Sequence, residues 1–141
     1  MWGDSVNGVR LVAVTERDVI PAGRPVIVQL RVENTGAPSL VVLTATHPLI
    51  DYDIGLTGPA GAVVAMTPAG KEAVEFLQSG DRFRRARIQL GLNEVYEEVL
   101  TLSEWFDVSR PGRYALTIAR ADYQDAQGKR PTVGPVEFAV A

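Results

Sequence analysis

The sequence predicts an all-β domain folded as a two-sheet antiparallel sandwich. Thirteen glycines and nine prolines divide the 141 residues at short intervals, and the runs between them are rich in Val, Ile, Leu, Thr and Tyr. This alternation of turn-forming and β-forming residues is typical of sandwiches. A second observation is a corner, because Pro111-Gly112 predicts a turn and Tyr114, Leu116 and Ile118 follow at every second position. Such a tyrosine enters the core at the start of a late strand, with its hydroxyl near the corner backbone.

Nine candidate strands follow from this punctuation. The clearest is 26–33, where Val26, Val28, Leu30 and Val32 alternate with less apolar residues and predict one buried face. The segments 52–56 and 62–66 are expected to form a hairpin across the turn at 58–61. The full set is 8–15, 26–33, 40–45, 52–56, 62–66, 83–90, 95–102, 112–120 and 133–140.

One segment departs from the strand pattern. Residues 71–79 place Ala73, Val74, Phe76 and Leu77 at helical spacing before a glycine, which predicts a helical insertion of one or two turns. The sequence shows no internal repeat and no linker, so we expect one domain over residues 1–141.

Composition and charge argue against several classes of function. The formal charge of −3 disfavours a nucleic-acid surface, which needs a net basic face. The longest apolar runs are too short for membrane insertion. Without cysteine, the chain forms no disulfide, no thiol nucleophile and no sulfur-ligated zinc site. Because the first residues have neither a basic nor an apolar leader pattern, we expect that a secretory signal is not part of this sequence.

No metal, cofactor or catalytic relay is expected. His47 is the only histidine, so a multi-histidine metal site cannot form and a Ser-His-Asp relay has one candidate base. Its place before Pro48 favours an extended loop, and we assign it no role. Asp51 and Asp53 are two residues apart on a predicted strand, which indicates a solvated face rather than a calcium site, since calcium needs about six to eight oxygen ligands.

The arginines and tryptophans allow two interpretations each. Arg82, Arg84, Arg85 and Arg87 could bind an acidic partner, but cross-strand ion pairs with Glu94, Glu97 and Glu98 are the simpler interpretation. The apolar positions change parity between Phe83 and Ala86, as at a β-bulge. A tryptophan can be a binding hot spot or part of the core. We expect Trp105 inside or at a sheet end, and Trp2 over one open end of the sandwich.

The loop at 122–130 is the best candidate for a binding site. Recognition by sandwiches usually falls on loops held at one end of the rigid sheets. This loop is long, polar and glycine-containing, and its tyrosine could anchor a contact. An ion-binding loop is disfavoured because its acids match no ligand spacing, and an inert hairpin is the alternative. The candidate contact residues are Asp122, Tyr123, Asp125, Lys129 and Arg130.

Several short stretches resemble an immunoglobulin-like domain common in bacterial extracytoplasmic proteins. They are Trp2-Gly3 with Val6-Asn7-Gly8-Val9-Arg10-Leu11, Val32-Glu33-Asn34-Thr35-Gly36, Asp51-Tyr52-Asp53-Ile54 and 102–114. In plan the chain is similar to the BsuPI-type intracellular proteinase inhibitor domain and to the non-catalytic N-terminal domain of deuterolysin-like metallopeptidases. The His-Glu-x-x-His helix of those peptidases is absent, so the resemblance implies no peptidase activity.

The resemblance implies an immunoglobulin-like sandwich used for binding or as a spacer, and it favours export from the cytoplasm. We therefore expect a non-enzymatic binding or accessory module of a bacterial extracytoplasmic protein, periplasmic or secreted, with another protein as its partner. A proteinase inhibitor of the BsuPI type is the alternative. An enzyme is disfavoured because candidate bases and nucleophiles do not converge in the sequence.

Overall fold

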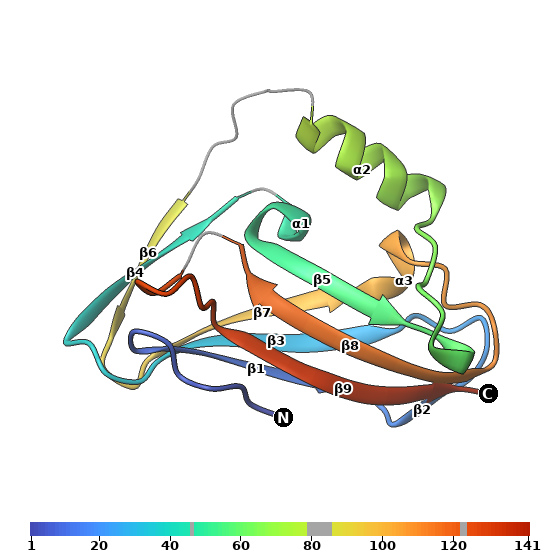
Figure 1. Cartoon of the computed structure of the whole chain (residues 1–141), viewed down its shortest axis with the longest axis horizontal. Coiled ribbons are helices and arrows are strands. Elements are labelled where there is room, and N and C mark those ends of the chain that lie inside the picture. The colour runs from blue at the N-terminus through green and yellow to red at the C-terminus, as the bar shows by residue number, and fades with distance from the viewer. Residues whose placement is uncertain (46, 79–85, 122–123) are drawn as a thin grey trace.

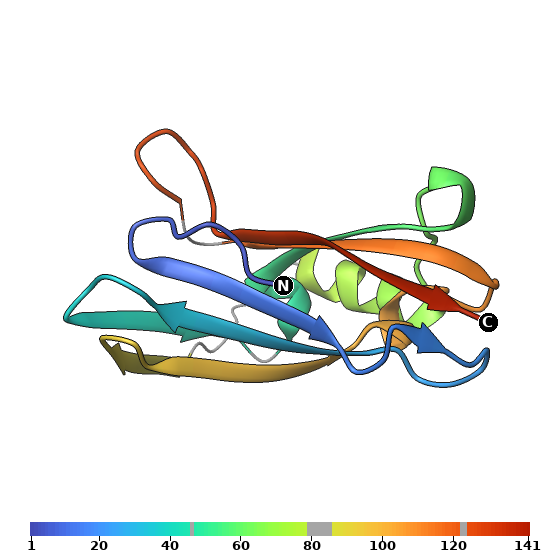
Figure 2. The same cartoon turned by 90° about the horizontal axis from the view of Figure 1, so that it is seen from below.

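The computed structural model describes residues 1–45, 47–78, 86–121 and 124–141. Two β-sheets pack face to face, and a separate two-stranded ribbon extends beyond them at one end (Figures 1 and 2). The first sheet has the order β1-β3-β7: β1 (Val9–Thr15), β3 (Ile27–Asn34) and β7 (Val95–Thr101). The second has the order β2-β9-β8-β5: β2 (Val19–Ile20), β9 (Thr132–Val140), β8 (Gly112–Arg120) and β5 (Tyr52–Thr57). The ribbon pairs β4 (Ser39–Thr44) with β6 (Ala86–Gly91).

The strand order is that of the immunoglobulin fold. Lettering β1, β3, β5, β7, β8 and β9 as strands A, B, C, E, F and G places A, B and E in one sheet and C, F and G in the other. All of these neighbours pair antiparallel, whereas the short β2 runs parallel to β9. The predicted immunoglobulin-like antiparallel sandwich is therefore confirmed.

The core lies between the two sheets and follows the period-two pattern of the sequence. Val26, Val28, Leu30 and Val32 are each at most 1% exposed, so the predicted dry face of this strand is confirmed. Complete burial of an aliphatic side chain of this size stabilises the fold by about 1.5–3 kcal/mol before entropic costs. This repeated burial fixes the register of β3, because a slip by one residue would turn its polar side chains into the core.

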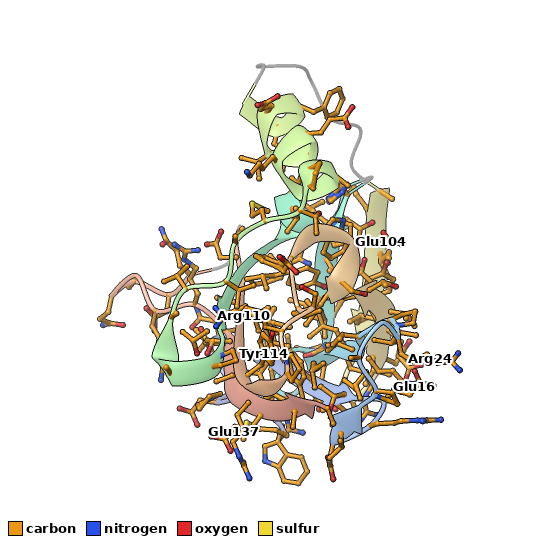
Figure 3. The ribbon with its side chains drawn as sticks, turned by 90° about the vertical axis from the view of Figure 1, so that its right-hand side faces the viewer. Glu16, Arg24, Glu104, Arg110, Tyr114 and Glu137 are labelled. Carbon is orange, nitrogen blue, oxygen red and sulfur yellow. The ribbon has the colours of Figure 1, made fainter. Side chains whose placement is uncertain are left out.

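The tyrosine corner predicted at the start of β8 is confirmed. Tyr114 is buried, and its hydroxyl donates a 2.6 Å hydrogen bond to the carbonyl oxygen of Arg110. Figure 3 shows the two residues side by side at one end of the sandwich. The Tyr114 ring stacks on Phe138 of β9 with ring centroids 5.3 Å apart. The corner therefore joins the turn before β8 to the core.

The helical insertion is longer than the sequence predicts. α2 (Pro68–Gln78) has 11 residues, which is about three turns instead of one or two. Residue 79 of the predicted segment and the glycine at 80 lie outside the described residues. α2 packs near α3 (Leu102–Trp105), and a Cβ on Gly70 would lie only 2.2 Å from the carbonyl oxygen of Trp105. The absence of a side chain at this position lets the two backbones approach.

The strand predicted at 62–66 is wrong. After the short helix η1 (Pro59–Gly61), this segment makes isolated bridges only, Thr57 with Val63 and Met66 with Phe106. The predicted hairpin with β5 closes only at its turn, where the Gly58 amide donates to the Ala62 carbonyl and the Val64 amide donates to the Leu56 carbonyl. Beyond it, the amide of Asp107 donates to the carbonyl of Ala65, so the chain around α3 satisfies the backbone there. For the predicted strand 83–90, β6 begins at Ala86, and 83–85 with the predicted bulge lie outside the described residues.

The two tryptophans have different surroundings. Trp105 is buried on α3, as expected. Trp2 is 70% exposed and does not cover an open end of the sandwich, so that expectation is wrong. Trp2 forms a bridge with Val12 alongside β1, and the guanidinium of Arg10 lies 5.7 Å from the centroid of its ring. The pairing of the chain before β1 with β1 itself places Trp2 beside β1, at the edge of the first sheet.

Candidate functional site

The candidate loop connects β8 to β9, which makes it the F–G loop of an immunoglobulin-like domain. We use this name for residues 121–131. Asp122 and Tyr123 lie outside the described residues. The segment 124–131 projects from the sandwich at the end where β4 and β6 lie (Figure 2). In immunoglobulin variable domains, the F–G and B–C loops at one end form the antigen-binding site. The connection from β3 to β5, which contains β4, reaches the same end (Figure 1).

Asp125 holds the described part of the F–G loop in a turn. Its carboxylate accepts hydrogen bonds from the amides of Gln127 and Lys129, at 2.9 and 2.8 Å. The backbone closes the same turn, because the Asp125 amide donates to the Lys129 carbonyl and the Gly128 amide donates to the Asp125 carbonyl. A short aspartate side chain that accepts from amides two and four residues ahead is the usual stabiliser of such turns. The described segment 124–129 is therefore largely exposed but internally bonded.

Two ion pairs tie this loop to neighbouring segments. Arg130 pairs through Nη1 with Oδ2 of Asp53 on β5. Lys129 Nζ lies 3.8 Å from Oδ2 of Asp4, and both side chains are more than half exposed. Exposed pairs of this kind contribute about 0–1 kcal/mol, so they orient the loop more than they stabilise the fold. The structure thus brings together Asp125, Lys129 and Arg130 of the predicted site.

Asp51 does not lie on a solvated face, and that prediction is wrong. It is the last residue of α1 (Pro48–Asp51) and is 3% exposed, and its carboxylate accepts hydrogen bonds from the Ala45 amide at 3.0 and 3.1 Å. Asp53, two residues later, is exposed on β5. Because a helical turn ends between them, the two carboxylates do not share a strand face. The sequence signal for this turn is the His47-Pro48 pair, since proline favours the first helical position.

His47 caps α1. Its Nδ1 accepts a 3.1 Å hydrogen bond from the amide of Leu49, and its ring lies 5.3 Å from that of Trp105. Burial lowers the pKa of His47, although the carboxylates of Glu104 and Asp51 oppose the shift. The neutral ring is the form that can accept the capping bond at Nδ1. These contacts give the imidazole a structural task in the helix cap.

A polar cluster lies between the sheets near the F–G loop; two of its members, Tyr52 and Arg120, are buried and the third, Glu98, is half-buried. Tyr52 of β5 donates a 2.7 Å hydrogen bond to Oε2 of Glu98 on β7. The guanidinium of Arg120, at the end of β8, lies 5.0 Å from the centroid of the Tyr52 ring, and its Nη2 donates to the Leu43 carbonyl of β4. Burial and the neighbouring Glu98 raise the pKa of Tyr52, so its hydroxyl stays protonated and donates. We call Tyr52, Glu98 and Arg120 the inter-sheet cluster.

The inter-sheet cluster borders a small apolar cavity of about 130 Å³. The aliphatic walls come from β1, β3 and β4, and Arg120 supplies the polar wall. Because Arg120 reaches both the β4 backbone and the Tyr52 ring, the cluster connects the β4–β6 ribbon to both sheets. The lining residues are Val9, Val32, Leu40, Val41, Val42, Leu43 and Arg120.

The arginine cluster is only partly visible. Arg82, Arg84 and Arg85 lie outside the described residues, and Arg87 is exposed on β6. β6 forms its ladder with β4 and belongs to a different sheet from β7. The predicted cross-strand pairing of Arg87 with glutamates of the next strand is therefore wrong, and Glu98 accepts a hydrogen bond from Tyr52 instead.

The described residues form neither a cluster of metal ligands nor a membrane-spanning helix. Within residues 1–45, 47–78, 86–121 and 124–141, no three His, Asp or Glu side chains gather as metal ligands would. None of the helices formed by these residues has the length and hydropathy needed to cross a bilayer.

A hollow of about 300 Å³ lies at the end of the sandwich opposite the F–G loop and is lined in part by Glu16, Arg17 and Arg24. Figure 3 shows Glu16 and Arg24 at the rim of that end.

Comparisons with known proteins give distant likenesses to solved structures only. No family model matches the sequence, and no curated protein matches it. Among solved structures, the chain is similar to the CARDB domain of the PF1109 protein from Pyrococcus furiosus, which was crystallised in complex with di-metal ions. The sequence identity is 10%, the TM-score is 0.44, and the match covers 97% of this chain and 92% of that chain. The immunoglobulin-like assignment rests on the strand order of this chain itself.

Proposed function

We propose that this chain is a non-catalytic binding or accessory module of a bacterial extracytoplasmic protein, and that its F–G loop contacts another protein. The observation that carries the proposal is the turn held by Asp125. A loop that is exposed but already bonded in one conformation loses little conformational entropy when a partner binds. Its place at one end of an immunoglobulin-like sandwich is where such folds carry their recognition loops.

The charges around the loop suit a protein partner. Lys129 keeps much of its side chain exposed beside Asp4, so both signs of charge are presented at this surface. Mixed charges of this kind provide orientation and register in protein recognition more than raw affinity. Tyr123 belongs to the same loop in the sequence and is the aromatic side chain that we expect to anchor the contact.

A capture experiment tests this proposal. The full chain is immobilised and exposed to the extracytoplasmic fraction of its native host, and retained proteins are identified by mass spectrometry. We expect the Tyr123→Ala/Lys129→Ala double variant to lose the captured protein while its melting temperature stays unchanged. Lys71→Ala, an exposed change on α2, is the matched control and should capture normally. Equal capture by the double variant and the wild type would place recognition elsewhere.

The alternative is a proteinase inhibitor of the BsuPI type, and the turn held by Asp125 supports it as well. Inhibitor complexes typically form with little backbone change, which a pre-bonded loop permits. A panel of purified serine proteases distinguishes the two functions. Stoichiometric inhibition that is lost in the double variant supports the inhibitor, whereas capture of a protein without any inhibition supports the accessory module.

A further inference from the structure

The two packed sheets have four outer strand edges, and the edge of β1 is covered by the start of the chain. The amide of Gly3 donates to the carbonyl of Leu11, and the amide of Ala13 donates to the carbonyl of Met1. The residues before β1 therefore satisfy backbone groups that β1 does not share with β3. A strand edge covered in this way is protected from pairing with another chain.

The edges of β5 and β9 are protected as well. On β5, the Tyr52 amide donates to the Pro48 carbonyl of α1, and the Leu56 carbonyl accepts from the Val64 amide. β9 pairs at one end with β2 and carries Pro135, whose nitrogen has no hydrogen to donate. Covering segments and edge prolines are two ways in which natural sheets prevent edge-to-edge association.

The fourth edge belongs to β7. At one end of the ladder between β3 and β7, the Asn34 amide donates to the Glu94 carbonyl, and at the other end the Leu102 amide donates to the Val26 carbonyl. The register between these two points has no shift, so every second residue of β7 bonds to β3. The residues between them direct their N–H and C=O groups away from β3, toward the free edge.

Val95, Glu97 and Val99 are these edge residues. Among the described residues, no group forms a hydrogen bond with their N–H or C=O groups. Val99 is 65% exposed, Val95 is 39% exposed and Glu97 is also exposed. The seven residues of β7 include no proline. β7 is therefore the open edge of the described sandwich, and such an edge is a template for an added strand.

The side chains of the same three residues indicate which strand would fit. They lie on the outer face of the sheet in the order aliphatic, acidic, aliphatic. A strand added to β7 would place its own side chains beside them, and the stabilising cross-strand partners are aliphatic, basic and aliphatic. Because this order reads the same in both directions, it applies to a parallel and to an antiparallel strand.

The carboxylate of Glu97 is free to form such a pair. Arg31 is its register partner on β3, but the Arg31 guanidinium lies 4.0 Å from Oε1 of Glu33. No ion pair between described residues involves Glu97. A second copy of the chain is a poor occupant, because β7 holds two glutamates and no basic residue. Pairing two β7 strands would bring like charges together without a cation in either strand.

We propose that β7 binds an extended segment of another protein by strand addition, and that this segment has the pattern aliphatic-x-basic-x-aliphatic with Lys or Arg beside Glu97. The backbone groups of Val95, Glu97 and Val99 supply the hydrogen bonds, and the Glu97 side chain supplies the selectivity. The proposal does not depend on the F–G loop, because none of these three residues belongs to it.

Hydrogen exchange of the full chain tests whether the edge is open. In the free protein, the amides of Val95, Glu97 and Val99 should exchange at least about tenfold faster than those of Tyr96 and Leu100, which pair with β3. Equal protection along β7 overturns the proposal, because the edge would then already be paired.

Peptide titration followed by amide NMR tests the selectivity. The probe is the peptide Thr-Val-Thr-Lys-Thr-Val-Thr, and a second peptide has Glu in place of Lys. We expect the lysine peptide to bind with a Kd below about 1 mM, to slow exchange at the three edge amides, and to bind about threefold or more tighter than the glutamate peptide. Glu97→Lys should reverse this preference. Glu137→Lys, the same change at an exposed position of β9, is the matched control and should not alter it.

Backbone methylation distinguishes strand addition from contact through side chains alone. N-methyl groups are placed on alternate residues of the lysine peptide, in one frame or in the other. Strand addition requires that one frame weakens binding about tenfold more than the other, because alternate amides face β7. Equal effects of the two frames overturn the proposal. Failure of the lysine peptide to bind at about 1 mM, shifts that spare β7, or a dimer mass at that concentration also overturn it.

Discussion

The hydroxyl of Tyr52 on β5 donates a 2.7 Å hydrogen bond to Oε2 of Glu98 on β7, and this bond joins the two sheets. Burial raises the pKa of Glu98, and the nearby carboxylate of Asp51 acts in the same direction. The bond from Tyr52 and the charge of Arg120 oppose the rise but do not cancel it. The fold therefore favours the protonated form of Glu98 more than the unfolded chain does.

We predict that Glu98→Gln removes a pH-dependent loss of stability. Because the folded-state pKa of Glu98 lies above the ordinary value of 4.5, the native state binds more protons than the unfolded state does. The stabilisation that Glu98 contributes is therefore fully present below pH 4.5 and is lost as the pH rises through the folded-state pKa. The free energy of unfolding of the variant, relative to the wild type, should increase between pH 4 and pH 7. Urea unfolding at several pH values measures it.

Glu97→Gln is the matched control for this prediction, because Glu97 neighbours Glu98 but lies on the exposed outer face. If Glu98→Gln and Glu97→Gln follow the same pH dependence, Glu98 does not titrate with a raised pKa.

We predict that Tyr114→Phe lowers the free energy of unfolding by about 0.5–1.5 kcal/mol, because the change removes the hydrogen bond from the Tyr114 hydroxyl to the Arg110 carbonyl. The stacking of the ring on Phe138 remains available to phenylalanine, so the loss isolates the bond from the hydroxyl to the Arg110 carbonyl. The denaturation midpoint in urea measures the effect. An unchanged midpoint would show that the corner bond contributes nothing.

Gly70→Ala sets helix propensity against packing. Alanine in place of glycine inside a helix should stabilise by about 1 kcal/mol, but the new methyl would lie 2.2 Å from the carbonyl oxygen of Trp105. Because that contact is with backbone, the helix must move, and overpacking of this kind costs about 1–3 kcal/mol. We expect a lower melting temperature for Gly70→Ala. Gly61→Ala tests positive-φ strain alone, since no atom lies within 4 Å of its added Cβ.

Asp125→Ala should loosen the F–G loop without unfolding the sandwich. The side chain accepts hydrogen bonds from the amides of Gln127 and Lys129, so both amides should exchange with deuterium faster in the variant. Amides of β8 and β9 serve as internal controls and should keep their protection. Unchanged exchange at Gln127 and Lys129 would mean that the backbone bonds hold the turn alone.

The melting temperature should be the same in excess calcium and in chelator. Asp51 accepts from the Ala45 amide, Asp53 pairs with Arg130, and Asp125 accepts from two loop amides, so these three carboxylates have protein partners. Tight calcium binding to the native state would raise stability by several kcal/mol at saturating concentrations. A calcium-dependent rise in calorimetry would contradict this prediction.

Local sequence patterns predict most of the strands. They do not predict segments that are too short to show a pattern or whose course depends on contacts with distant parts of the chain. The strand predicted at 112–120 matches β8, because strict alternation and the Pro-Gly turn both mark it. The two-residue β2 is too short for any periodicity, and it exists because β9 offers it a partner. The segment 62–66 has apolar residues typical of a strand, but tertiary pairing with the chain near α3 decides its course.

Among the polar interactions, too, the sequence predicts those between near neighbours and misses those between distant residues. The F–G loop could be placed from its composition, since its turn depends on residues within five positions of one another. The inter-sheet cluster joins residues 52, 98 and 120, and no local spacing relates them. The backbone of His47 is extended, as predicted, but the four-residue helix that follows is too short to show a periodicity, so Asp51 was expected on a strand. The sequence signal for this helix is Pro48, because proline suits the first helical position.

The parallel pairing of β2 with β9 should make this part of the fold resistant to stretching. The amides of Ala22, Ala139 and Ala141 bond to the carbonyls of Ala141, Asp18 and Ile20 respectively. A force that draws the start of β2 and the end of β9 apart acts along both strands in opposite directions, so it loads these bonds together in shear. Antiparallel strands pulled from one shared end would instead separate bond by bond. Single-molecule stretching from these two points should therefore meet a higher rupture force than stretching across the β4–β6 ribbon.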